Sequence, residues 1–311
     1  MGNDRPGGRP QRVAAGRTGG ESVTTPAKPP PPLYANRKLA QGYPDIERLG
    51  SDYFADHQDT STDVLKTMQR IGRLTALGQH PTVLVIGCGP NPRSIRELLD
   101  AGFGASGVEP VGFHVETAAR FLGGAGFVLE GTAESLPATD ESQDAVIMES
   151  VLEHVDSAHQ SLAEVFRVLK PGGVLYVTTT NRTRFSLTGK NGEFFVPFYN
   201  WLPAIVKESY VFRHLHYDPS LAAYTPRPAV HWFTYPELCA LGRQAGFAQF
   251  YSFLDLIDET VDESVASSRA KTWIVRAVRR RPWFRALMIS QMTGNPMFMY
   301  KRSDPGAAPA G

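Results

Sequence analysis

The chain lacks most of the features that mark secreted, membrane-spanning or nucleic-acid-binding proteins. Its 311 residues include only two cysteines, Cys88 and Cys239, which gives neither a disulfide framework nor a metal site with paired ligands. The formal net charge is +1, so no global charge excess favours nucleic acid. No run of about 18 apolar residues occurs, which excludes a membrane span at the usual threshold. We expect a cytoplasmic protein without a metal and without a nucleic-acid partner.

The two ends of the chain also lack apolar sequence. Gly, Pro, Arg and Thr dominate the first residues, where a secretory signal would need a hydrophobic centre. We therefore expect a disordered tail over residues 1–36 and a flexible tail over 303–311. The 42% hydrophobic content fits one domain between them, over residues 37–302.

Within this domain, strand patterns alternate with helix patterns. Apolar spacing and breaker residues predict helices over 61–77, 93–101, 111–121, 158–169 and 236–244, with Ser61 or Thr62 capping the first. They predict strands over 83–86, 104–108, 126–129, 144–148, 173–179, 247–254 and 296–301. Such alternation is typical of an α/β fold with a mostly parallel sheet covered by helices on both faces.

Two segments interrupt the alternation. Residues 181–231 crowd aromatic side chains among Pro and Gly, and a connection of this length is typically a lid or binding element, so we expect a substrate lid. Residues 262–292 form a basic helical insertion. Its part over 267–289 mixes Trp, Phe and Leu with Arg and Lys, the composition of helices that meet anionic lipid. The alternative is a solvated helix whose cations pair with the acids at 255–263.

A glycine pair follows the first predicted strand. Gly87 and Gly89 flank Cys88, and Glu109 ends the second strand about 20 residues later. Glycines at a strand-to-helix turn expose backbone N–H groups, and an acid at the next strand end accepts hydrogen bonds from ribose hydroxyls. Asn91 and Pro92 stand where a dinucleotide fingerprint has its third glycine, which argues against a pyrophosphate ligand.

These segments together resemble the successive motifs of class I S-adenosylmethionine-dependent methyltransferases, closest to the small-molecule branch that includes ubiquinone and menaquinone biosynthesis enzymes. The resemblance rests on five segments in register, over roughly residues 60–254: residues 83–90, 107–110, 131–137, 144–155 and 169–175. It implies a Rossmann-like, doubly wound, seven-stranded sheet and S-adenosyl-L-methionine as the cofactor. The implied reaction is methyl transfer to a small-molecule acceptor, in which an oxygen, nitrogen or carbon nucleophile attacks the sulfonium methyl.

The resemblance also implies roles for individual residues. Gly87, Cys88 and Gly89 would lie under the amino acid portion of the cofactor, and Glu109, with Pro110 after it, at the ribose. The other implied cofactor contacts are Thr132, Ala133 and Glu134 beside the adenine, and Glu149 and Ser150 at the methionine part.

Two positions depart from the family pattern. Val85 stands where the family commonly has an acid, so the contact to the cofactor's ammonium is expected from Glu149. Asn91 stands where a glycine is common, and asparagine tolerates the positive φ that such a turn needs.

If the acceptor is a hydroxyl, a general base assists. His154, whose counterpart in the family faces the cleft, and His231, from the aromatic insert, are the candidates. The aromatic insert favours an apolar, aromatic or lipid-like acceptor, or a sugar, and hydroxyl O-methylation.

Other functions remain open from the sequence. They are a methyltransferase-like protein that has lost its chemistry and serves as a binding partner, and a peripheral membrane methyltransferase that acts on a lipid at the inner face of a membrane. A dinucleotide oxidoreductase is a further alternative. The sequence leaves the oligomeric state open.

Overall fold

The computed structural model describes residues 63–185, 196–203, 206–207, 229, 231–257 and 268–303. The predicted tail over 1–36 lies outside the described residues, as do all but the first residue of the tail over 303–311 and most of the predicted lid over 181–231. Ser61 and Thr62 also lie outside them, and Asp63 caps the first described helix by accepting a hydrogen bond from the Lys66 backbone N–H.

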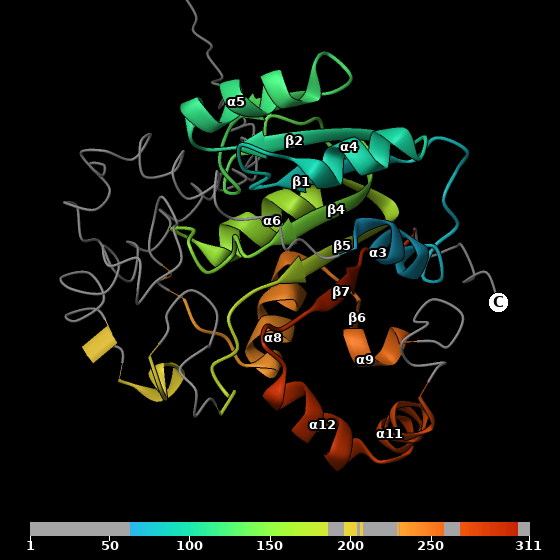
Figure 1. Ribbon diagram of the computed structural model, residues 1–311, viewed down its shortest axis with the longest axis vertical. Coiled ribbons are helices and arrows are strands. Elements are labelled where there is room, and N and C mark those ends of the chain that lie inside the picture. The colour runs from blue at the N-terminus through green and yellow to red at the C-terminus, as the bar shows by residue number, and fades with distance from the viewer. Residues whose placement is uncertain are drawn as a thin grey trace, which may run out of the picture.

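A seven-stranded sheet forms the centre of the described structure (Figure 1). Its strand order is β3-β2-β1-β4-β5-β7-β6, and β7 runs antiparallel to both neighbours while the first five strands are parallel. The strands are β1 Thr82–Ile86, β2 Gly104–Glu109, β3 Phe127–Glu130, β4 Gln143–Glu149, β5 Leu169–Thr178, β6 Gln249–Ser252 and β7 Met297–Tyr300. This arrangement confirms the predicted Rossmann-like, doubly wound, mostly parallel seven-stranded sheet.

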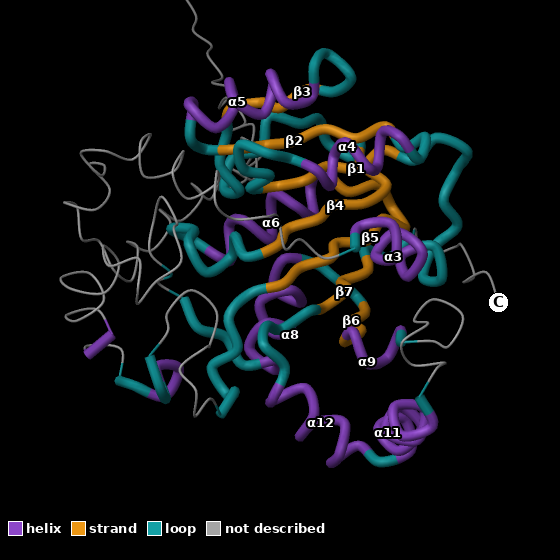
Figure 2. Tube along the Cα trace, viewed as in Figure 1, coloured by secondary structure: helices purple, strands orange, loops and turns teal. Residues whose placement is uncertain are grey.

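Helices alternate with the parallel strands along the chain (Figure 2). The described helices are α3 Val64–Ile71, α4 Arg93–Asp100, α5 Gly112–Leu122, α6 Ala158–Val168, α8 Tyr235–Ala245, α9 Phe253–Leu256, α11 Arg269–Arg280 and α12 Pro282–Gln291, with a 3₁₀ turn, η1, at Tyr199–Trp201. None of these described helices has the length and hydropathy that a bilayer span requires.

The sheet is buried on both faces, which explains why its strands read as continuous aliphatic runs. On one face, Leu84, Ile86, Val146 and Met148 pack with α6 and α8. On the other face, alternate residues of the same strands pack with α3, α4 and α5; Val83, Val85, Ala145 and Ile147 belong to this cluster. Because both faces are covered, a ligand can reach the parallel sheet only at the ends of its strands, which are called the ligand edge below where they are the carboxyl ends.

Four predicted elements differ from the structure. The helix expected over 61–77 ends at Ile71, with Gly72 as its C-cap. The strand expected over 247–254 is limited to β6, because Ser252 and Asp255 form a capping box that starts α9. The segment expected as one helix over 267–289 is two helices, since Pro282 begins α12 and Arg281 has an extended backbone. The strand expected over 173–179 begins earlier, at Leu169, opposite an irregularity between Gln143 and Ala145.

Candidate active site

Two glycines form the turn after β1, and each position requires glycine for a different structural reason. Gly87 and Gly89 have φ values of 66° and 64°, which favour glycine. A Cβ on Gly87 would lie 2.4 Å from Val151 Cγ2, so packing also requires this glycine. A Cβ on Gly89 would meet none of the described residues within 4 Å. The backbone of Gly89 therefore faces open space, as a close approach by a ligand requires. Asn91 does not have a positive φ, and the glycines supply both positive φ values of the turn.

Cys88 contributes only its backbone to this turn. Its Sγ lies 2.7 Å from where a Cβ on Gly107 would stand, and the side chain packs against the cluster that covers β1 and β2. Burial, with the nearby Glu109 carboxylate, raises the pKa of the Cys88 thiol to about 12. The thiol is therefore protonated at neutral pH and is no nucleophile.

The Glu109 carboxylate joins the glycine turn to the end of β2. Its side chain is buried; Oε2 accepts a hydrogen bond from Gly89 N at 3.1 Å, and Oε1 accepts one from Val111 N at 3.3 Å. His114 Nδ1, in the first turn of α5, lies 3.1 Å from Oε1. A carboxylate offers about four lone-pair sites, so the three donors leave it able to accept from a ligand hydroxyl. The sequence did not lead to His114 as a site residue, although His114 lies only five residues after Glu109.

The other predicted cofactor contacts follow the neighbouring strands at the same edge of the sheet. In the register, Ile86 pairs with Val108 and Met148, and Glu109 pairs with Glu130. The carboxyl ends of β1 to β4 therefore meet in one row, which is where open α/β sheets bind ligands.

Ser150, directly after β4, has a φ of 52°, an unusual value for a residue other than glycine. Its N–H donates to Thr178 O at 3.0 Å, which holds this conformation against the end of β5. Ser150 is exposed and Glu149 is half-buried at the ligand edge. Sparsely populated backbone conformations concentrate at functional sites, which agrees with the expected role of this turn.

The Glu134 side chain holds the turn after β3 in place. Glu134 Oε1 accepts hydrogen bonds from Asp156 N at 2.7 Å and Ser157 N at 3.3 Å, so one carboxylate ties this turn to the segment before α6. Ala133 is buried, whereas Thr132 and Pro110 are exposed at the ligand edge. Glu134 thus has a structural role that the sequence did not predict.

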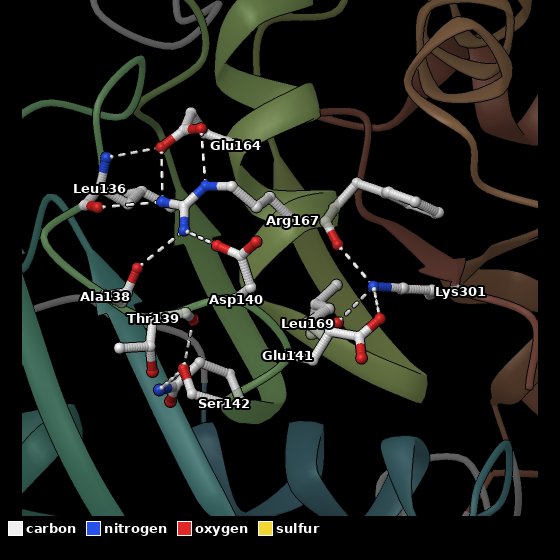
Figure 3. Close-up of polar contacts among 12 residues, drawn as sticks. Leu136, Ala138, Thr139, Asp140, Glu141, Ser142, Glu164, Arg167, Leu169 and Lys301 are labelled. Carbon is white, nitrogen blue, oxygen red and sulfur yellow. Dashed lines mark hydrogen bonds and ion pairs between the residues drawn. The ribbon is translucent and has the colours of Figure 1, made fainter.

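Arg167 fixes the segment that follows this turn (Figure 3). Its guanidinium donates to Leu136 O at 3.1 Å, Ala138 O at 2.9 Å and Asp140 Oδ1 at 2.6 Å, and it also pairs with Glu164 on the same helix. The ion pair holds the pKa of Glu164 below its usual value. The loop between β3 and β4 is therefore anchored to α6 through the Arg167 side chain.

The two candidate bases lie near each other, although 77 residues separate them. His231 N donates to Glu153 O at 3.1 Å, and His231 Nε2 lies 2.8 Å from Val155 O, so these contacts enclose His154. The carbonyl at Nε2 leaves Nδ1 as the nitrogen of His231 that can accept a proton. Burial lowers the pKa of His231, and His154 lowers it further. His154 is half-buried, and its Nδ1 is buried with no hydrogen-bond partner in the part of the chain that the structure describes.

A cavity of about 420 Å³ lies beyond the end of β5, lined by Arg182, Thr183, Asn200, Trp201 and Leu202. Asn200 Nδ2 donates to Asn181 O at 2.9 Å. Behind the cavity wall, the buried Lys207 ammonium donates to Asn200 O at 2.8 Å and lies 4.2 Å from the centre of the Trp232 ring. Burial lowers the pKa of Lys207 to about 8. Sequence reasoning did not single out Asn200 or Lys207, because only tertiary packing brings them to this place.

Comparison with known proteins agrees with this geometry. Residues 84–177 match the family described as methyltransferase domain. A probable S-adenosylmethionine-dependent methyltransferase of Mycolicibacterium smegmatis is 44% identical over 59 residues, which cover 19% of this chain and 23% of that protein. A ubiquinone biosynthesis O-methyltransferase of Caulobacter vibrioides is 31% identical over 144 residues, which cover 45% of this chain and 56% of that protein. The matches thus span less than two thirds of either curated relative.

A solved structure of an S-adenosylmethionine-dependent methyltransferase from Thermotoga maritima is 27% identical, with a TM-score of 0.43, and the match covers 66% of this chain and 80% of that one. The match to the methyltransferase family spans β1 to β5, the part of the Rossmann-like sheet that carries the glycine turn. The chain is thus similar to S-adenosylmethionine-dependent methyltransferases.

The residues present fit the cofactor of this class. The open space at Gly89 accepts a ligand against a bare backbone, and the Glu109 carboxylate stands beside it with capacity for a hydroxyl hydrogen bond. Val85 is buried in β1 with its side chain in the core, so it offers no charge to an ammonium.

Proposed function

We propose that this protein transfers a methyl group from S-adenosyl-L-methionine to a small-molecule acceptor. The observation that carries the proposal is the pairing of the open Gly89 backbone with the buried Glu109 carboxylate across β1 and β2. In this proposal, Gly87, Cys88 and Gly89 contribute backbone contacts, Glu109 accepts from the ribose hydroxyls, and Glu149 faces the ammonium.

The remaining predicted residues complete the proposed cofactor site. Pro110, Thr132, Ala133 and Glu134 border the nucleoside, and Ser150 borders the methionine portion. When bound, the cofactor supplies a methyl group activated by the positive charge on its sulfur. The protein's own contribution is alignment and the exclusion of water, a proximity effect of several kcal/mol.

The acceptor in this proposal is an apolar, aromatic or lipid-like molecule, or a sugar, with a hydroxyl as the methylated group. Phe185, Phe198 and Trp201 support it, because their side chains are 45%, 40% and 56% exposed and form ring contacts at 5.2 and 5.4 Å beside the cavity after β5. The resemblance to a ubiquinone biosynthesis O-methyltransferase agrees with an apolar acceptor. Residues 181–231 are proposed as the lid over this acceptor.

A labelled methyl group tests the proposed activity. Incubating the protein with methyl-labelled S-adenosylmethionine and an apolar cell extract is expected to produce a labelled small molecule, detected by mass spectrometry. Label that stays in the donor with every extract fraction, although the protein binds S-adenosylhomocysteine, favours the alternative of an inactive binding protein.

Replacing both His154 and His231 with alanine is expected to lower turnover by about 10²- to 10⁴-fold, because the acceptor hydroxyl loses its general base. The lowered pKa of His231 keeps the ring neutral at pH 7, so the wild-type rate should decline only as the pH falls through the range below about 6.5. His159→Ala, on α6 outside this pair, serves as the control. Turnover of the double variant within a few-fold of wild type would contradict the base assignment.

A weak association with an anionic membrane surface through residues 267–289 is a second proposal. The exposed Trp273 and Trp283 favour it, since these side chains are 67% and 63% exposed on a basic helix pair. The alternative pairing with the acids at 255–263 holds for one cation, because Arg285 Nε donates to Asp255 Oδ1 at 2.7 Å. Most of these acids lie outside the described residues.

A further inference from the structure

Helix α12 carries an exposed apolar stripe. Trp283 is 63% exposed and Leu287 is 49% exposed, and their spacing of four residues places them on the same helix face. Trp273, on the neighbouring α11, is 67% exposed. Large apolar side chains exposed on one helix face favour a binding surface there.

The end of α12 is hydrogen-bonded to the segment after β5. One turn after Leu287, Gln291 Oε1 accepts a hydrogen bond from Phe185 N at 3.2 Å, and Thr183 Oγ1 donates to Ser290 O at 3.3 Å. Phe185 in turn stacks near Trp201, with 5.2 Å between ring centroids. The end of α12 and the segment after β5, which each carry exposed apolar side chains, are thus held together by hydrogen bonds.

The charged residues of α11 and α12 themselves are of one sign. Residues 264–303 contain no Asp or Glu, whereas Arg and Lys occupy seven positions between 269 and 285. Arg280 and Arg281, at the junction of α11 and α12, are exposed. Arg285 is paired with Asp255 and belongs to the fold. A basic surface of this kind attracts anionic lipid headgroups.

We propose that Trp273, Trp283, Leu287, Phe185, Phe198 and Trp201 form one surface that docks on an anionic lipid bilayer. Tryptophan beside arginine suits the boundary between headgroups and acyl chains, where an indole ring is half in an apolar and half in a wet environment. Because the surface ends at the rim of the cavity after β5, docking places that cavity at the bilayer. An apolar acceptor enters the active site from the lipid; this second part rests on the proposed function.

Co-sedimentation with vesicles tests the docking surface. The full chain is expected to sediment with vesicles of phosphatidylglycerol and phosphatidylcholine at low salt, and to remain in solution with phosphatidylcholine alone. Trp283→Ala with Leu287→Ala should weaken binding about tenfold or more through lost apolar area. Arg280→Gln with Arg281→Gln should weaken it and reduce its salt dependence. Phe127→Ala, a 58% exposed side chain on β3 at the opposite edge of the sheet, is the matched control and should bind as wild type.

Brominated lipid tests the continuity of the surface with the cavity. Bromine in the acyl chains is expected to quench the tryptophan emission of the bound protein, and Trp201→Phe should remove part of the quenched signal. Docking is overturned if the wild type stays in solution at low salt, or if the Trp283/Leu287 variant binds as well as wild type. Unchanged quenching in Trp201→Phe would separate the cavity from the bilayer and overturn the entry route.

Two further measurements distinguish bilayer docking from self-association and from the proposed methyl transfer. Sedimentation without lipid detects self-association, and a dimer that the Trp283/Leu287 variant abolishes, with no vesicle binding, would show that a second copy of the chain covers this surface instead. S-adenosylhomocysteine should bind all these variants with wild-type affinity. Failure of vesicle binding with intact binding of S-adenosylhomocysteine refutes only the docking surface, whereas the reverse result refutes only the proposed transferase.

Discussion

Replacing Gly89 with alanine is expected to lower the affinity for S-adenosylhomocysteine by about 10- to 100-fold, because the new methyl group enters the space in which the ligand approaches the backbone. The free protein should lose only about 1–2 kcal/mol of stability, the cost of a left-handed conformation for a residue with a Cβ. Isothermal titration gives the affinity, and denaturant unfolding gives the stability.

Gly102→Ala separates strain from ligand contact in this experiment. Gly102 has a φ of 88°, and a Cβ there also meets nothing within 4 Å, but this glycine follows α4 and lies away from the ligand edge. Its alanine variant should lose similar stability and keep full affinity. Equal affinities for the two alanine variants would show that the space at Gly89 is not the cofactor site.

Replacing Glu109 with glutamine is expected to have the second large effect. The carboxylate accepts from Gly89 N and Val111 N and faces His114, so the amide would present N–H groups to at least one of these donors. Stability should fall by about 2–3 kcal/mol through the unsatisfied group. Affinity for S-adenosylhomocysteine should fall about 100-fold, because charge-assisted hydrogen bonds to the ribose are lost. Thermal melting and titration measure the two effects.

Glu130→Gln is the matched control for this variant. Glu130 pairs with Glu109 in the strand register and ends β3 at the same edge of the sheet, but its side chain is exposed. The control should change neither stability nor affinity by more than a small amount. A Glu109→Gln variant that melts lower but binds S-adenosylhomocysteine as wild type would restrict Glu109 to a structural role.

The strands and the ligand edge were predictable because they follow from local patterns. The aliphatic runs at 83–86 and 144–148 lack polar alternation, which only a sheet covered on both faces explains. Once the strands are parallel, their carboxyl ends share an edge, so Gly87, Glu109 and Glu149 come together. The hydrophobic pattern of the strands is therefore enough to predict that these residues, distant in the sequence, lie at one site.

The directions of individual side chains were not predictable in this way. Cys88 turns its thiol into the core against Gly107, and His114 turns toward Glu109, because both positions depend on how α4 and α5 pack. The role of Glu134 as a hydrogen-bond acceptor for Asp156 N depends likewise on two loops meeting. A sequence pattern indicates which face of a helix or strand is buried, whereas these contacts join different helices, strands and loops.

Element boundaries failed where capping groups competed with apolar patterns. Residues 247–254 read as one strand, yet the Asp255 carboxylate accepts from Ser252 N at 2.7 Å and ends the strand there. Residues 267–289 read as one helix by composition, and Pro282 was the visible signal for two. In both places a single polar or proline residue outweighs the hydrophobic spacing.

A crystal structure grown with S-adenosylhomocysteine tests the central claim most directly. The account predicts electron density against the backbone of Gly89, with the ribose hydroxyls within hydrogen-bonding distance of the Glu109 carboxylate. Density elsewhere on the protein, or a ligand edge filled by the protein's own side chains at saturating ligand, would contradict it.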